Sequence, residues 1–117
     1  MATVQDLANS IAKMEGFFVS NSVAQRNNNP GNLKFMGQNG AIGQDSNGFA
    51  IFFNSDVGWQ ALNNQINLDA SRGLTLNQFI NKYAPSSEND TSNYLQFVSQ
   101  QTGIAPSATL DAGFPKG

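Results

Sequence analysis

The spacing of apolar residues predicts a long first helix at the N-terminus. Apolar side chains recur three or four positions apart at Val4, Leu7, Ile11, Met14 and Phe18. This period defines one face of an amphipathic helix, and Thr3 is a suitable N-cap for it. The helix is expected to end at about Phe18 or Val19. Gly16 in its last turns costs about 1 kcal/mol relative to alanine, which favours an earlier unwinding.

The same spacing predicts three further helices in the second half of the chain. Cap residues at their starts, and Gly73, Pro85 and Gly103 at their ends, bound these helices at residues 55–73, 75–85 and 90–103. The Thr75-to-Gln78 stretch makes a capping box at the start of the middle one. Trp59 lies on the apolar face of the first of them and is expected in the core.

The segment between the first two predicted helices is rich in glycine and asparagine and predicts a small β lobe. Residues 27–32 read Asn-Asn-Asn-Pro-Gly-Asn, which is a dense turn signal. Two short strands are expected after it, at residues 33–36 and 49–53. The expected fold class is α+β, mostly helical, with a glycine-rich antiparallel lobe after the first helix. Residues 1–110 are expected to form a single domain, and residues 111–117 a tail or linker stub.

Composition excludes several kinds of chemistry. The 117 residues include no cysteine and no histidine, so disulfides, thiolate nucleophiles, histidine bases and the usual zinc ligands are missing. A net charge of −2 with only six Lys and Arg residues argues against a nucleic-acid partner. No stretch approaches the roughly 18 apolar residues of a membrane span, and no cofactor or metal is expected. Any catalysis must therefore rest on carboxylates.

Glu15 is the first candidate for such catalysis. It is one of only two glutamates in the chain, and it borders the apolar face of the predicted first helix. Partial withdrawal from water is expected to let this carboxyl hold its proton to higher pH, as a general acid requires. The alternative is an ordinary solvated residue at the edge of the helix.

Three motifs follow one another along residues 4–106. They are Met-Glu-Gly-Phe at 14–17, Arg-Asn-Asn-Asn-Pro-Gly-Asn-Leu at 26–33, and Tyr-Ala-Pro with Glu-Asn-Asp-Thr at 83–91. This order resembles the lysozyme-like superfamily, phage and bacterial glycosidases that cleave peptidoglycan as muramidases or lytic transglycosylases. The chain departs from the transglycosylases in the hairpin, which lacks their common Gly-Leu-Met-Gln string.

The resemblance implies a lysozyme-like fold and cleavage of the β-1,4 bond between N-acetylmuramic acid and N-acetylglucosamine, with Glu15 as general acid. It matches Asp45 to a hairpin aspartate of goose-type lysozymes and Tyr83 to a tyrosine that approaches the sugar in transglycosylases. Asp45 is then either a second catalytic carboxylate or only the start of an Asx-turn. Without a second carboxylate, the 6-hydroxyl of muramic acid attacks and a 1,6-anhydro product forms.

The remaining polar candidates are expected to contact the glycan. Asn28, Asn32 and Gln44 carry planar amides that suit sugar hydroxyls and N-acetyl groups, although the turn at 27–32 equally suits a structural role. Glu88 lies at a loop-to-helix junction. It is either a contact at the rim of the site or an acid favoured there by the helix dipole.

Two functions without catalysis stay open beside the glycosidase. One is a glycan-binding module or phage structural component that retains the fold, and the other is a protein-binding adapter that uses the amide-rich face. The N-terminus lacks a signal-peptide pattern. We therefore expect synthesis in the cytoplasm and action at the cell wall, as a phage, virion-associated or secreted protein. The expected partners are peptidoglycan glycan strands, and the protein is expected to be a monomer.

Overall fold

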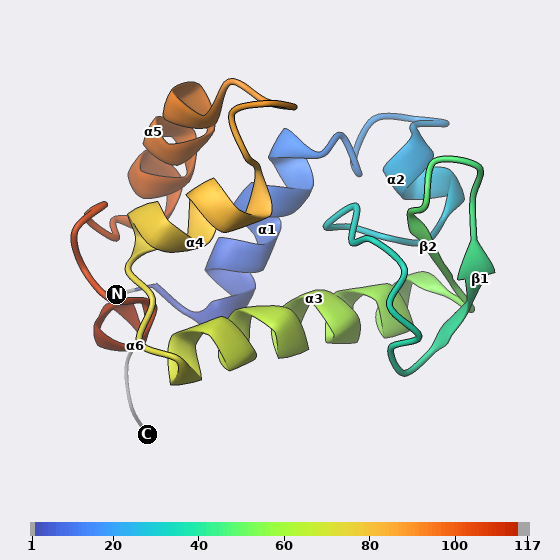
Figure 1. Ribbon diagram of the computed structural model, residues 1–117, viewed down its shortest axis with the longest axis horizontal. Helices are drawn as coiled ribbons and strands as arrows, with labels where there is room; N and C mark the ends of the chain where they lie inside the picture. Colours follow the sequence, from blue (N-terminus) through green and yellow to red (C-terminus); the bar gives the residue numbers. More distant parts are fainter. Residues whose placement is uncertain (1, 115–117) are drawn as a thin grey trace. The chain divides into compact units, whose positions relative to one another are not determined.

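The computed structural model describes residues 2–114 and has an α+β fold in which about half of these residues are helical (Figure 1). Within these residues, six helices and one two-stranded antiparallel sheet form. In chain order the elements are α1 (Val4–Met14), α2 (Val23–Arg26), β1 (Ala41–Gln44), β2 (Ala50–Phe52), α3 (Ser55–Ser71), α4 (Leu76–Tyr83), α5 (Thr91–Thr102) and α6 (Leu110–Gly113). The predicted α+β class is thus confirmed.

The chain divides into two compact units. We call residues 11–65 the lobe unit, and the residues up to Ser10 together with those from Ile66 onward the helical unit. The boundaries fall inside α1 and α3. Each unit is described by itself below.

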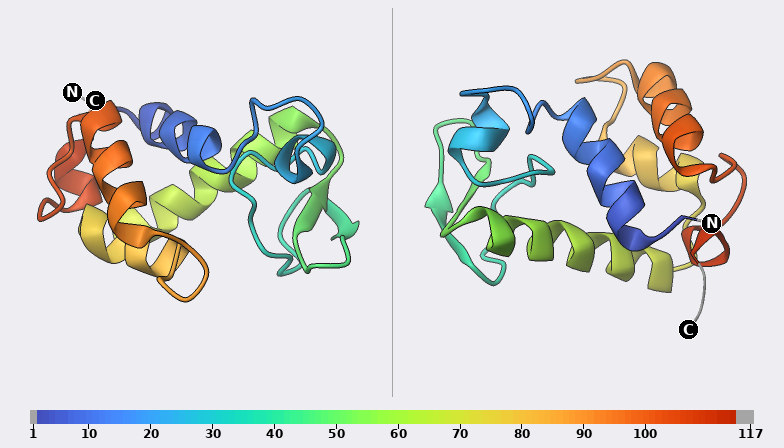
Figure 2. Two further views of the ribbon diagram at one scale, coloured as in Figure 1. Left: turned by 90° about the horizontal axis from the view of Figure 1, so that it is seen from above. Right: turned by 180° about the vertical axis from the view of Figure 1, so that it is seen from behind.

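In the helical unit, α4 and α5 pack side by side, as both views of Figure 2 show. Three predicted helix boundaries are confirmed here. The Thr75–Gln78 capping box forms at the start of α4, the Asp90 side chain caps α5, and Gly103 ends α5 in a left-handed conformation at φ 76°. Asp69 is almost fully buried and accepts a hydrogen bond from Lys82 Nζ at 2.6 Å, which ties α3 to α4.

The C-terminal segment is folded further than the predicted tail. Helix α6 begins behind a Thr109 cap, and the side chain of Leu110 is completely buried. The backbone N–H of Leu110 donates to Leu74 O at 2.9 Å, and that of Leu76 to Ala108 O at 2.9 Å. The tail predicted from Asp111 is therefore wrong up to Gly113, because the burial of Leu110 and the cap order the chain there. Residues 115–117 lie outside the described residues.

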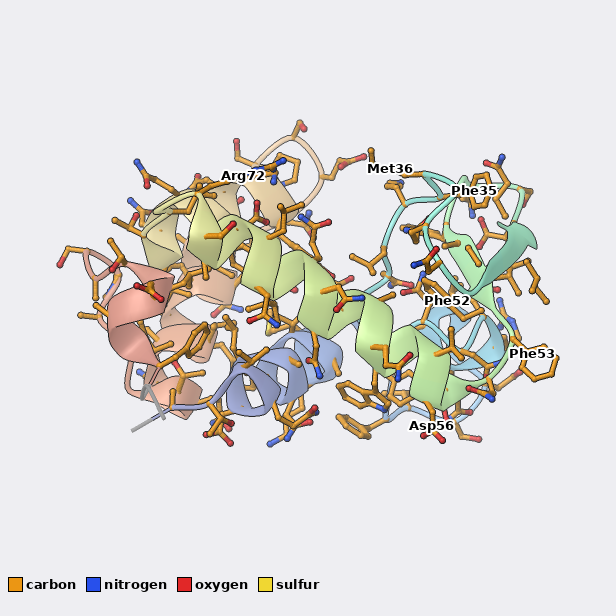
Figure 3. The ribbon with its side chains drawn as sticks, turned by 90° about the horizontal axis from the view of Figure 1, so that it is seen from below. Phe35, Met36, Phe52, Phe53, Asp56 and Arg72 are labelled. Atoms are coloured by element: carbon orange, nitrogen blue, oxygen red, sulfur yellow. The ribbon has the colours of Figure 1, made fainter. Side chains whose placement is uncertain are left out.

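In the lobe unit, β1 and β2 form an antiparallel hairpin with a register shift between Ala41 and Gly43. Side chains alternate across β2 and beyond it (Figure 3). Phe52 points into the lobe and is 1% exposed, whereas Phe53 points outward and is 72% exposed. Phe52 therefore anchors the hairpin in the core of the lobe unit, and Phe53 faces solvent.

The first predicted strand is misplaced. Residues 33–36 contribute only an isolated bridge between Lys34 and Phe49, while β1 forms later, at Ala41–Gln44. Two features stop a ladder at 33–36. The side chain of Gln38 accepts from the backbone N–H of Met36 at 2.8 Å, and Gly37 turns the chain at φ 70°. The second strand lies within its predicted range.

The first helix is shorter than predicted. It ends at Met14 because Gly16 adopts φ 79°, the left-handed conformation of a helix C-cap. Two hydrogen bonds close this end: Phe17 N–H to Ala12 O at 3.0 Å, and Gly16 N–H to Lys13 O at 3.3 Å. They are the two bonds of a Schellman motif, so the helix cannot run on to Phe18 or Val19. The early unwinding that the sequence predicted at Gly16 is therefore observed.

Candidate active site

Glu15 directly follows the last residue of helix α1, and its backbone is held by hydrogen bonds. Its N–H donates to Ile11 O at 2.9 Å, and the Schellman bonds of Gly16 and Phe17 fix the chain immediately after it. Its side chain is partly buried. A carboxyl on a fixed backbone that is neither fully solvated nor sealed from solvent is placed as a general acid needs to be.

Asn32 approaches Glu15 from the turn between α2 and the hairpin. Its Nδ2 donates to Glu15 Oε1 at 3.2 Å and lies 3.5 Å from the main-chain oxygen of Glu15. The two residues are 17 positions apart, so tertiary folding brings them together. Asn32 was predicted to contact substrate, and the structure places its amide on the candidate acid.

The turn at residues 27–32, which we call the asparagine turn, is held by its own side-chain amides. Asn29 is completely buried, and its Nδ2 donates to Leu33 O at 3.0 Å and to Ala50 O at 2.9 Å, while its Oδ1 accepts from Leu33 N–H at 2.9 Å. Asn28 Nδ2 donates to Phe52 O at 3.1 Å. These bonds satisfy buried backbone groups of the lobe. They favour the structural interpretation of this turn, with Asn28 serving the lobe.

Asp45 stands at the start of the turn that joins the two strands. Its Oδ1 accepts from the backbone N–H groups of Asn47 and Phe49, both at 2.9 Å, and its Oδ2 accepts from Asn27 Nδ2 at 2.9 Å. The Asn27 amide lowers the pKa of Asp45 below its ordinary value of 3.8; partial desolvation opposes this, and the backbone donors of Phe49, Asn47 and Gly48 reinforce it. Asp45 therefore forms the Asx-turn foreseen as one alternative.

We expect Asp45→Asn to destabilise the lobe in a pH-dependent way. The new Nδ2 would face the Nδ2 of Asn27, placing two donors together. Because the folded pKa of Asp45 is lowered, the stability from its charge is complete above the ordinary value of 3.8 and is lost as pH falls through the folded value. Melting temperatures of both proteins between neutral pH and about pH 2 should show a gap that narrows in acid. A gap of constant size would contradict this role for the charge.

Three other predicted site residues lie in β1 and in the helical unit. Gln44 ends β1 with an exposed side chain. Tyr83 and Glu88 belong to the helical unit. The Tyr83 ring packs on Phe79 with centroids 5.4 Å apart, and Glu88 is exposed in a loop where its N–H donates to Pro85 O at 2.9 Å.

An aromatic cluster that begins two residues after Glu15 was missed by the sequence analysis. Phe17 packs edge-to-face on both Phe18 and Trp59, with centroids 5.4 Å apart in each pair, and Phe18 lies 6.2 Å from Trp59. Phe18 is 57% exposed, and Trp59 is partly exposed rather than sealed in the core as predicted. The signal was present in the sequence, since two phenylalanines follow Glu15-Gly16 directly.

Within residues 2–114, no three acidic residues gather where they would share a metal ion. Over the same residues, each helix is too short or too polar to cross a membrane. Comparison of the chain with protein-family models, curated proteins and solved structures finds no match.

Proposed function

We propose that this protein cleaves the β-1,4 bond between N-acetylmuramic acid and N-acetylglucosamine in peptidoglycan, with Glu15 as general acid and then general base. The motif order that resembles the lysozyme-like superfamily supports the reaction and the lysozyme-like fold. The observation that carries the proposal is the setting of Glu15. It is a partly buried carboxyl at a fixed helix end, hydrogen-bonded by Asn32, in a chain without histidine or cysteine.

The chemistry needs few residues. Glu15 donates its proton to the leaving oxygen of N-acetylglucosamine as the bond to C1 of muramic acid breaks and an oxocarbenium-like centre develops. The resulting carboxylate then removes a proton from the incoming nucleophile as that nucleophile bonds to C1. Both routes end with Glu15 protonated again. If the nucleophile is water the product is a reducing sugar, and if it is the 6-hydroxyl the product is a 1,6-anhydro sugar.

The setting of Asp45 favours the second route. Both of its carboxylate oxygens already accept hydrogen bonds from the lobe, so this side chain is committed to the turn. A carboxylate that acts as nucleophile or as base for water must direct an oxygen at the sugar or at that water, whereas both oxygens of Asp45 are directed at groups of the lobe. We therefore propose the anhydro-forming reaction of a lytic transglycosylase, which uses one glutamate.

The test is mass spectrometry of the muropeptides released from purified peptidoglycan. The proposal expects products that are lighter by one water than hydrolysed muropeptides. Products with a reducing end would show a glycosidase that hydrolyses the bond, and Asp45 would again be a candidate for the second catalytic carboxylate. The absence of released products would overturn the proposed activity on that wall.

The aromatic cluster favours a second candidate, a glycan-binding module without catalysis. Exposed aromatic rings bury the apolar faces of ligands, and Phe18, which follows Glu15 closely in the sequence, offers such a surface together with the partly exposed Trp59. This candidate expects binding of N-acetylated oligosaccharides without release of products. An adapter for another protein would bind neither the oligosaccharides nor the cell wall. In each glycan-directed case the partner is the peptidoglycan strand and the place of action is the cell wall.

A further inference from the structure

We propose that Asn32 is a positioning residue, whose amide orients the carboxyl of Glu15 and stabilises the negative charge that forms there when the proton leaves. The inference rests on the proposed function in so far as it concerns the reaction. The contact between Asn32 and Glu15 belongs to the folded lobe unit, and it can be tested without substrate.

The direction of the Asn32 amide follows from its neighbours. Its nitrogen lies 3.2 Å from Glu15 Oε1 and 3.5 Å from the main-chain oxygen of Glu15. A main-chain oxygen only accepts hydrogen bonds, so the NH₂ side must face it. The other side, Oδ1, is buried and has no hydrogen-bond partner among the described residues. The orientation of the amide is therefore set by the two contacts that its nitrogen makes with Glu15.

The backbone beneath Asn32 is also committed to this arrangement. Asn32 has φ 47°, in the left-handed region that glycine and asparagine adopt more readily than other residues. Its N–H donates to Asn29 O at 3.0 Å, and the Asn29 side chain is itself locked in the buried network of the lobe. The amide is thus presented to Glu15 from a segment with little freedom to move.

This contact gains strength during the proposed reaction. A hydrogen bond to a carboxylate is stronger than one to a neutral carboxylic acid. The N–H of Asn32 therefore interacts more strongly with Glu15 after the proton has been delivered than before it. An interaction that grows toward the transition state raises the rate without tightening substrate binding.

Asn32→Gly isolates the amide, because glycine accepts φ 47° without strain. The matched control is Asn21→Gly, which makes the same change at φ 64° in an exposed turn, where the backbone bonds to Gln25 and Arg26 are retained. We expect Asn32→Gly to lower kcat by about tenfold to a hundredfold with KM nearly unchanged. Asn21→Gly should match the wild-type protein in both constants. A wild-type kcat in Asn32→Gly would overturn the proposal.

A second measurement does not depend on activity. The side-chain carboxyl carbon of Glu15 is followed by NMR during a pH titration of wild type, Asn32→Gly and Asn21→Gly. Loss of an N–H that favours the ionised form should move the Glu15 midpoint to higher pH in Asn32→Gly only. The other ionisable groups of the lobe unit are Lys13, Arg26, Lys34, Asp45 and Asp56, and no variant alters them.

The two arms separate the possible failures. If the wild-type protein releases no muropeptides, the proposed function fails, while the NMR titration still decides whether Asn32 acts on Glu15. If the wild-type protein cleaves peptidoglycan and the Glu15 midpoint is the same in all three proteins, the positioning role of Asn32 is overturned and the glycosidase remains.

Discussion

Glu15→Gln is expected to abolish the release of muropeptides, lowering the rate by about a thousandfold or more. Glutamine cannot donate a proton to the leaving oxygen, and no histidine or cysteine exists to replace it. The fold should persist, because the amide oxygen of glutamine still accepts from Asn32 Nδ2. Mass spectrometry of products from purified peptidoglycan measures the loss.

Two controls make this result specific. Asp56→Asn removes one carboxylate from the exposed first turn of α3 (Figure 3), and it should leave cleavage unchanged. Trp59, the sole tryptophan, lies in the aromatic cluster, so its fluorescence should respond to N-acetylated oligosaccharides equally in wild type and Glu15→Gln. Unaltered cleavage by Glu15→Gln would rule out Glu15 as the acid. Oligosaccharide binding without cleavage by either protein would favour the binding module.

Gly58→Ala is expected to destabilise the protein by about 3 kcal/mol, against the usual direction of this change. In a helix interior, alanine is normally more stable than glycine by about 1 kcal/mol. Here the asparagine turn crosses α3 too closely. A Cβ on Gly58 would lie 1.9 Å from Asn28 O and 2.8 Å from Pro30 Cδ, so the turn or the helix must shift. Urea unfolding measures the loss of free energy of unfolding. In thermal unfolding, the same loss should lower Tm by roughly 10 °C.

Gly43→Ala is the matched control for this effect. Gly43 lies in β1, has no positive φ, and has no heavy atom within 4 Å of where a Cβ would stand. The substitution should change the free energy of unfolding by less than about 1 kcal/mol. If Gly58→Ala were as stable as wild type, the close approach of Asn28 and Pro30 to α3 would be wrong.

The helices of the second half of the chain were predictable because their limits depend on neighbours in sequence. The capping box of Thr75 and Gln78 joins residues three positions apart, and so does the Asp90 cap of α5. Gly103 supplies a left-handed residue at the point where the helix must end. Contacts between residues this close in sequence are specified by the local sequence and do not depend on the tertiary fold.

The lobe was predicted in kind but not in detail. A glycine- and asparagine-rich segment indicated a small antiparallel sheet, which the structure contains. The position of its first strand was wrong, because side-chain amides compete with the sheet for backbone partners. Asn29 bonds to Leu33 and Ala50, and Gln38 bonds to Met36. Periodicity reports which side chains prefer burial and does not report which backbone groups are already occupied.

For the candidate site, the sequence by itself supplied the proposed residue and the proposed carboxylate chemistry. A chain without histidine or cysteine leaves carboxylates, and Glu15 stands at the end of an amphipathic helix. Only the tertiary structure decided what surrounds it. Asn32 reaches Glu15 across 17 residues, and Trp59 meets Phe17 across 42. Phe17 meets Trp59 after the chain has left helix α1, and Asn32 meets Glu15 from the turn at residues 27–32. Such contacts depend on the path of the whole lobe, so no local pattern encodes them.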